Sequence, residues 1–289
     1  MPFGPSELIL NADKSIYHLN LFSKDIADTI ITVGDPDRVA QVSAHFDSIE
    51  LKKGKREFIT HSGIKNGKRL TVISTGIGTD NIDIVLNELD ALANINLETR
   101  TLNPKLKKLN IIRVGTSGAI QPDIPLDSFL ISEYALGLDA LLSNYESTTI
   151  RNSAFEQAFL NQVNWSTQKP TPYAVQCDEK LLNKFASNRI RLGSTITASG
   201  FYVPQFREIR LKTDTINLLQ EIMQFSFENR QLTNLEMETS GIYGLSKLLG
   251  HRAISLNAIL ANRATGEFSK QPNKTIASLI ELTIETITK

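Results

Sequence analysis

The feature that most constrains this chain is an alternation between short apolar runs and longer amphipathic segments. Runs rich in β-branched residues recur along the sequence, at residues 29–33, 70–74, 110–114, 129–132, 190–197 and 252–260. Segments with apolar residues at helical spacing stand among them, at residues 80–93, 238–249 and 275–288. Because strands that alternate with helices are typical of one fold class, the pattern predicts an α/β protein.

Glycines mark the ends of several of these runs. Gly34 follows the first run, Gly76 and Gly78 follow the second, and Gly115 and Gly118 follow the third. An open α/β sheet binds its ligand at the ends of strands, where glycine lets the backbone come close to it. No Pro- or Ser-rich linker divides the 289 residues, so we expect a single domain over residues 1–289. The polar stretch 94–108 is expected to be an inserted loop or short helix.

Composition excludes several classes of protein. The 31 basic residues balance 31 acidic ones, so no overall positive field favours nucleic acid or an anionic membrane. The single cysteine, Cys177, excludes an intrachain disulfide, and the four histidines lack metal-ligand spacing, so we expect no metal site. The amino terminus does not resemble a signal peptide, and no apolar run approaches the roughly 20 residues that span a bilayer. We therefore expect a cytoplasmic protein.

Two motifs that contain arginine predict an anion site. Gly34-Asp35-Pro36-Asp37-Arg38 follows an expected strand and opens an expected helix, whose free N–H groups and Arg38 could face one anion. Arg113 ends another apolar strand, and Gly115 and Thr116 after it offer close backbone approach and a hydroxyl. A plain turn and an arginine paired with a carboxylate are the structural alternatives for each motif alone. Neither motif is a triphosphate loop, and the glycines at 76 and 78 lack the third glycine of a dinucleotide fingerprint.

Further motifs occur in the order and approximate spacing of one known family. They are Gly34 to Arg38, Arg56-Glu57-Phe58, Ser74 to Gly78, Arg113 to Gln121, Phe201-Tyr202 with Gln205 and Arg207, Glu236-Met237-Glu238, and Asn262-Arg263. On these motifs the chain resembles the nucleoside phosphorylase superfamily over nearly its whole length, and its uridine phosphorylase branch most. The resemblance implies one α/β domain whose twisted mixed β-sheet is partly barrel-like and flanked by helices. It also implies a pentosyltransferase that reversibly cleaves uridine, or deoxyuridine or thymidine, with inorganic phosphate as co-substrate and no other cofactor.

The resemblance further implies a phosphate site shared between subunits. Gly34, Arg38, Arg113 and Thr116 match the family's phosphate ligands, and Arg56 matches an arginine that a neighbouring subunit supplies. The implied assembly is at least a homodimer, and a homohexamer built as a trimer of dimers is usual in the family.

The ribose site is implied by the same resemblance. Met237 and Glu238 match the residues that bind the sugar, and His18 resembles a histidine that reaches the 5′ hydroxyl across the dimer interface. The N-terminal segment 1–20 would therefore contribute to that interface. A surface histidine and an acidic helix start are the structural alternatives for His18 and Glu238.

Three residues match the site that recognises the base. Phe201 would pack against base and sugar, while Gln205 and Arg207 would read the uracil edge and stabilise the leaving base. With Arg113 and Glu238 these two form the implied catalytic set. Because Gln205 and Arg207 are two residues apart, they would point to opposite faces of a strand, so both can address one base only from a turn or a helix start.

Two departures from the family matter for specificity. Thr79-Asp80-Asn81 stand where the family has a small stretch near an interface ion, which argues against a bound potassium ion. Asn262-Arg263 stand where purine-specific branches place an aspartate, which favours a pyrimidine substrate. The alternatives are a purine nucleoside phosphorylase or nucleosidase of the same superfamily, a noncatalytic nucleoside-binding protein, and a dinucleotide-dependent oxidoreductase.

Overall fold

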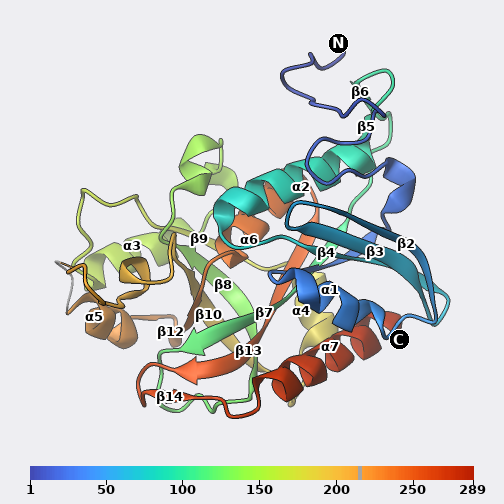
Figure 1. Ribbon diagram of the computed structural model, residues 1–289. Coiled ribbons are helices and arrows are strands. Elements are labelled where there is room, and N and C mark those ends of the chain that lie inside the picture. Colours follow the sequence, from blue (N-terminus) through green and yellow to red (C-terminus); the bar gives the residue numbers. More distant parts are fainter. Residues whose placement is uncertain (214–216) are drawn as a thin grey trace.

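A long mixed sheet organises the fold. In the computed structural model, which describes residues 1–213 and 217–289, its main path runs β11-β12-β10-β8-β13-β7-β1-β4-β3-β2 (Figure 1). These strands are β1 (Thr29–Val33), β2 (Ser48–Lys55), β3 (Phe58–Lys65), β4 (Lys68–Ser74), β7 (Asn110–Ala119), β8 (Phe129–Gly137), β10 (Arg191–Thr197), β11 (Ser226–Phe227), β12 (Arg230–Glu236) and β13 (Arg252–Asn262). Two more strands, β9 (Tyr173–Gln176) and β14 (Glu267–Phe268), pair with β8 and β13.

Part of the sheet closes on itself. Strand β12 pairs with β10 in parallel and also with β7 in antiparallel, at Asn234 opposite Ala119 and Leu235 opposite Gly118. This second pairing closes β7, β13, β8, β10 and β12 into a ring. The expectation of a mixed, partly barrel-like sheet is confirmed. The third apolar run is longer than the sequence indicated, because β7 continues past Gly115 and Gly118 to complete the ring.

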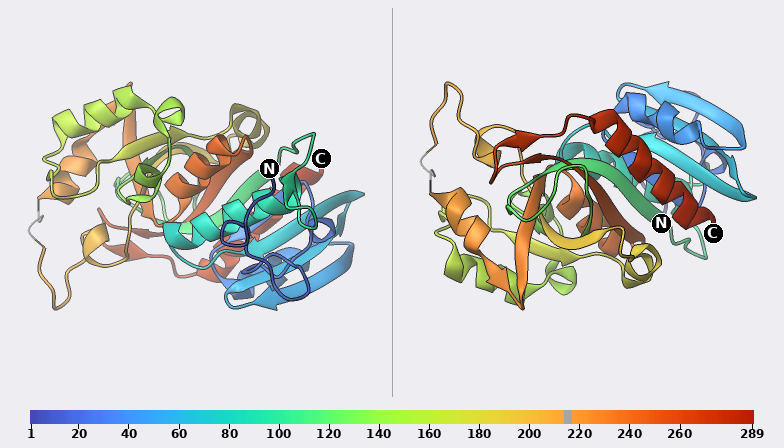
Figure 2. Two further views of the ribbon diagram at one scale, coloured as in Figure 1. Left: turned by 90° about the horizontal axis from the view of Figure 1, so that it is seen from above. Right: turned by 90° about the horizontal axis from the view of Figure 1, so that it is seen from below.

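Helices cover both faces of the sheet, as expected for an α/β protein. Helices α2 (Thr79–Asn94) and α6 (Thr239–Leu248) lie on one face, and α1 (Pro36–Ser43) and α7 (Pro272–Thr288) lie on the other (Figure 2). The shorter helices are α3 (Ser153–Gln162), α4 (Glu179–Phe185) and α5 (Leu218–Gln224), with 3-10 turns at Ser23–Asp25, Leu141–Asn144, Thr148–Ile150 and Val203–Gln205. None of the helices in the described ranges has the length and apolar character needed to cross a bilayer.

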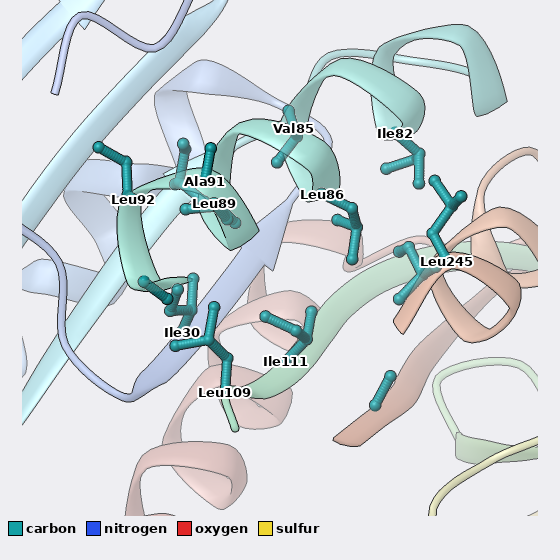
Figure 3. Packing of buried hydrophobic residues seen from close by; sticks show 14 of the residues in the cluster. Ile30, Ile82, Val85, Leu86, Leu89, Ala91, Leu92, Leu109, Ile111 and Leu245 are labelled. Carbon is teal, nitrogen blue, oxygen red and sulfur yellow. The ribbon is translucent and has the colours of Figure 1, made fainter. Parts of the chain in front are cut away.

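Alternating residues of the central strands build a separate core on each face. Ile30 of β1 and Ile111 of β7 pack under Leu86 and the other apolar residues of α2 (Figure 3). Their sequence neighbours Ile31 and Ile112 belong to a second cluster, which includes the apolar residues of α1 and α7. Because successive side chains of a strand point to opposite faces, the continuous apolar runs of the sequence reflect strands that are buried on both sides.

The polar stretch 94–108 differs from the expectation in part. Residues Ile95–Asn96 (β5) and Thr101–Leu102 (β6) pair as a small hairpin. The expectation of a short helix is therefore wrong, and the expectation of a loop holds only for the residues of this stretch outside the two strands. The Asn96 side chain accepts hydrogen bonds from the backbone N–H groups of Glu98 and Thr99, at 2.9 and 3.0 Å. These bonds satisfy a tight turn rather than a helix, a role for which asparagine is well suited.

Candidate active site

A cavity of about 890 Å³ opens where several strands of the sheet end. Strands β1, β4, β7 and β13 run parallel, so the segments that follow them meet at one edge of the sheet. Most of the predicted site residues line the cavity, namely Gly34, Arg38, Arg113, Thr116, Phe201, Gln205, Arg207, Met237 and Glu238. Its wall also contains residues to which the sequence assigned no role, among them Glu57, Asn81, Ser117 and Phe268.

The start of helix α1 forms one part of the cavity wall. Gly34 follows β1, and the side chain of Asp35 caps the helix by accepting a hydrogen bond from the backbone N–H of Asp37 at 2.9 Å. Pro36 occupies the first helical turn, where its missing N–H costs nothing. This turn brings Arg38 into the cavity wall.

Arg38 is a buried cation without a counter-ion in the described part of the chain. It is 9% exposed, yet no described carboxylate forms an ion pair with it, and its guanidinium has one long hydrogen bond of 3.5 Å to the carbonyl of Val114. Burial lowers the pKa of Arg38, and Arg113 adds to this effect while Asp35 opposes it. Since a buried charge is costly unless it is paired, this position favours an anionic ligand.

Arg113 lies at the centre of a buried ion cluster. Its Nη2 lies 2.6 Å from Glu238 Oε2 and 3.0 Å from Glu236 Oε2, and its Nη1 donates to Asn257 Oδ1 at 3.1 Å. Burial acts to lower the pKa of Arg113, but Glu236 and Glu238 outweigh it and raise this pKa. A Cβ atom on Gly115 would lie 1.8 Å from Arg113 Nη1, so the glycine is what allows the side chain to fold back over its own strand.

Glu238 connects the arginine to the segment after β4. One carboxylate oxygen accepts from Arg113 and the other accepts from the backbone N–H of Gly78 at 2.9 Å. Glu236, two residues earlier, accepts from Thr197 Oγ1 at 2.6 Å, and burial raises its pKa despite the nearby Arg113. Met237 between them also faces the cavity. Two carboxylates therefore share one guanidinium at this site.

Gln205 and Arg207 come together from a turn, so their side chains meet although they are two residues apart. A short 3-10 turn ends at Gln205, and Phe206 has a left-handed backbone with φ of 61°. Arg207 Nη1 then donates to Gln205 Oε1 at 2.7 Å and to the carbonyl of Phe201 at 2.8 Å. The guanidinium carbon lies 4.1 Å from the centre of the Phe201 ring, so the three side chains form one polar and aromatic cluster.

Arg263 holds this turn in place, a role that its motif did not reveal. It follows β13, and its guanidinium donates to the carbonyls of Gln205 at 2.8 Å and Phe206 at 3.2 Å. No local pattern could have predicted this contact, because it joins segments separated by 58 residues.

His18 and Arg56 lie outside the cavity of their own chain. His18 Nδ1 lies 2.6 Å from Glu88 Oε1 on α2, and Arg56 is exposed in the turn between β2 and β3, with a φ of 56°. The structure of one chain therefore does not bring these two residues together with the other predicted ligands. Across the described ranges, no group of three or more His, Cys, Asp or Glu side chains is arranged to hold a metal ion.

Comparison with known proteins identifies the family. The sequence model of the phosphorylase superfamily matches residues 28–286. The chain belongs to the phosphorylase superfamily. A uridine phosphorylase of Thermococcus kodakarensis is 29% identical over 264 residues, which cover 90% of this chain and 82% of that protein. A DeoD-type purine nucleoside phosphorylase of Shewanella loihica is 25% identical over 93% of this chain and 96% of its own length.

A solved structure extends the similarity to the fold. The Trypanosoma brucei nucleoside phosphorylase, which shows uridine phosphorylase activity, superposes with a TM-score of 0.85 at 28% identity. The match covers 96% of this chain and 98% of that one. The expected nucleoside phosphorylase fold is thereby confirmed for this member of the superfamily.

Proposed function

We propose that this chain is a uridine phosphorylase, which cleaves uridine with inorganic phosphate to uracil and ribose 1-phosphate. The observation that carries the proposal is that one cavity contains both Arg38, a buried arginine that no carboxylate of the described residues pairs with, and the cluster of Phe201, Gln205 and Arg207. The similarity to two proteins with uridine phosphorylase names or activity supports the choice of substrate.

Phosphate is proposed to bind between helix α1 and strand β7. Gly34, Arg38, Arg113 and Thr116 all line this part of the cavity, and guanidinium groups match phosphate oxygens in geometry and charge. Bound there, phosphate is both nucleophile and counter-ion. Its oxygen bonds to C1′ as the bond from C1′ to N1 breaks, and its negative charge stabilises the positive charge that develops on the ribose.

The electron pair of the broken bond leaves with the base. Arg207 would donate a hydrogen bond to a uracil carbonyl oxygen, and Gln205 would hydrogen-bond the carbonyl and N3–H edge of the base. Negative charge develops on the carbonyl oxygens only as the bond breaks. Removing one such donor typically costs about 3 kcal/mol of barrier, on the order of a hundredfold in rate. No proton donor to the base is needed, because uracil leaves as a stabilised anion.

Ribose is proposed to lie against Met237 and Glu238. Glu238 already has one oxygen on Arg113 and the other on the Gly78 amide, so its position is fixed before the sugar arrives. The 5′ hydroxyl would be bound by His18 of the partner subunit, and the phosphate by Arg56 of the partner subunit. Both residues lie outside their own cavity, which is what a shared site requires.

A shared site makes the homodimer the smallest functional unit of this proposal, and a hexamer would repeat it as a trimer of dimers. We place the enzyme in nucleoside salvage in the cytoplasm, where the free and buried Cys177 would remain reduced. Neither a nucleic acid partner nor a metal ion forms part of the proposal.

Purine nucleoside phosphorylase is the second candidate, because several relatives carry that name. Purine bases need protonation at N7 as they leave, and the purine branches place an aspartate after the last long strand. Here Asn262 is 3% exposed, and its side-chain amide donates hydrogen bonds to the carbonyls of Gln121 and Ile124, both at 2.9 Å. This structural role favours the pyrimidine assignment.

A panel of nucleosides tests the assignment. Release of free base is followed with uridine, deoxyuridine, thymidine, inosine and adenosine at saturating phosphate. We expect uridine to have the highest kcat/KM, and preferential cleavage of inosine would contradict the base assignment. The variant Arg207→Ala should lower kcat about a hundredfold, and a change confined to KM would contradict its leaving-group role.

A further inference from the structure

The β5–β6 hairpin lies outside the cavity, yet it holds the segment that carries His18. Residues 1–22 precede the first 3-10 turn, and their own secondary structure is one isolated bridge between Leu10 and Ile16. The backbone hydrogen bonds inside this segment are local turns, such as Leu8 N–H to the Gly4 carbonyl and Asn20 N–H to the Ile16 carbonyl, so contacts with other parts of the molecule set its position on the protein.

Arg100 of the hairpin clamps the beginning of this segment. Its Nε donates to the carbonyl of Phe3 at 2.9 Å, and its Nη2 donates to the carbonyl of Gly4 at 2.9 Å and also to that of Leu8. In return, the backbone N–H of Phe3 donates to the Arg100 carbonyl at 2.7 Å. Hydrogen bonds from a charged guanidinium are stronger than neutral ones, so this contact can fix where this stretch of backbone lies on the protein.

The hairpin presents Arg100 through its turn. Arg100 has a left-handed backbone with φ of 59°, and its N–H closes the turn onto the carbonyl of Asn96 at 2.7 Å. Ile95 and Leu97 of the hairpin pack against the same hydrophobic cluster as Phe3 and Leu8. The hairpin that carries Arg100 is therefore anchored to the hydrophobic core of the protein.

Further hydrogen bonds connect the stretch that Arg100 contacts, residues 3–8, with His18. Asn11 donates to the carbonyls of Ile16 and Tyr17, and Lys55 Nζ donates to Asn11 Oδ1 at 2.8 Å and to the Tyr17 carbonyl at 2.6 Å. The carboxylate of Glu88 then accepts from the backbone N–H of His18. Arg100 holds the upstream end of this chain of contacts.

We infer that Arg100, and with it the β5–β6 hairpin, is a positioning element for His18 in the partner's ribose site. The inference rests on the proposed function, because it requires His18 to contact the 5′ hydroxyl of the nucleoside. Arg100 does not line the cavity, and its loss would let the beginning of the N-terminal segment shift so that His18 is held less precisely.

The test compares uridine with 5′-deoxyuridine, which lacks the hydroxyl that His18 would bind. The variant His18→Ala should raise KM for uridine relative to 5′-deoxyuridine by roughly 3- to 10-fold, the effect of one hydrogen bond. Arg100→Met, which keeps the apolar stem, should shift the same ratio by about 3-fold and leave KM for phosphate unchanged. In the double variant Arg100→Met with His18→Ala, the ratio should match that of His18→Ala alone, since both changes remove one contact.

A matched control is available in Arg69. Its guanidinium also donates to backbone carbonyls of the N-terminal region, those of Ile26 and Lys24, at 2.6 and 2.8 Å, but downstream of His18. Arg69→Met should leave the ratio unchanged. Arg100→Lys, which retains part of the donor set, should give an intermediate ratio and serves if Arg100→Met does not fold.

The outcomes separate the two hypotheses. If His18→Ala does not change the ratio, the proposed role of His18 is wrong. If His18→Ala changes the ratio while both Arg100 variants leave it at the wild-type value, the positioning role of Arg100 is wrong. An equal shift in Arg69→Met would show a general loosening and would also overturn the inference.

Discussion

Replacing Arg113 with methionine should distinguish the contribution of Arg113 to the free energy of unfolding from its contribution to activity. Methionine approximates the length of the arginine stem but removes the cation that Glu236 and Glu238 share at 3.0 and 2.6 Å. Both carboxylates are at least nine-tenths buried, so the variant would keep two buried negative groups without their counter-ion. Removing one partner of a buried ion pair typically costs about 3–5 kcal/mol of folding free energy.

The loss should depend on pH in a defined direction. Burial raises the pKa of Glu236 in the native protein, and removing Arg113 takes away the charge that opposes this rise. A carboxyl whose folded pKa lies above its unfolded value of about 4.3 binds more protons in the folded state. Its contribution to stability is therefore fully present below pH 4.3 and is lost as pH rises through the folded pKa.

Urea unfolding of wild type and Arg113→Met at pH 5 and pH 8 tests this reasoning. We expect the variant to lose about 3–5 kcal/mol at pH 8 and clearly less at pH 5. The double variant Arg113→Met with Glu236→Gln should regain more than half of the loss at pH 8, yet its kcat/KM should stay at least about a hundredfold below wild type. An equal loss at both pH values, or a double variant no more stable than the single one, would refute the argument.

Further predictions concern the support of the site. Gly115→Ala should raise KM for phosphate in steady-state assays, because its Cβ would meet Arg113 Nη1 at 1.8 Å. Gly118→Ala lies in the same cavity wall, but its nearest protein neighbour would be 3.8 Å away, so its effect on KM should be smaller. Equal effects would contradict the steric account. Arg263→Met should lower kcat for uridine roughly tenfold while KM for phosphate stays the same, since it frees the turn that carries Gln205. Burial lowers the pKa of His61, so the stability that the neutral imidazole contributes should be lost as pH falls below about 6.5. In His61→Asn, the midpoint of urea unfolding should therefore change less between pH 7.5 and pH 5.5 than it does in wild type.

The sequence predicts the interior of the sheet better than its edges. Residues 29–33 and 110–114 are apolar without a break because both faces of β1 and β7 are covered, and such runs are easy to recognise. Strand β2 is not recognisable from the sequence, because it is an edge strand with exposed or half-buried residues, including Lys53 and Lys55. Alternation between buried and exposed positions is weak in such a strand, so little in the sequence distinguishes it from a polar loop.

For the site, motifs point to residues but not to their partners. The glycines and arginines around Gly34 and Arg113 carry a local signal, since backbone approach and anion binding need those residue types. Arg263 contacts the turn at Gln205, and Arg100 contacts Phe3. Each of these contacts joins two segments that are distant in the sequence. Such contacts are fixed by the closed ring of strands and by surface packing, which a single sequence does not show.

The most direct test of the central claim is the identity of the sugar product. Purified enzyme is incubated with uridine in the presence and absence of inorganic phosphate, and ribose 1-phosphate, free ribose and uracil are quantified. We predict that uracil and ribose 1-phosphate form in equal amounts and only when phosphate is present. Free ribose formed at the same rate without phosphate would identify a nucleosidase and contradict the account.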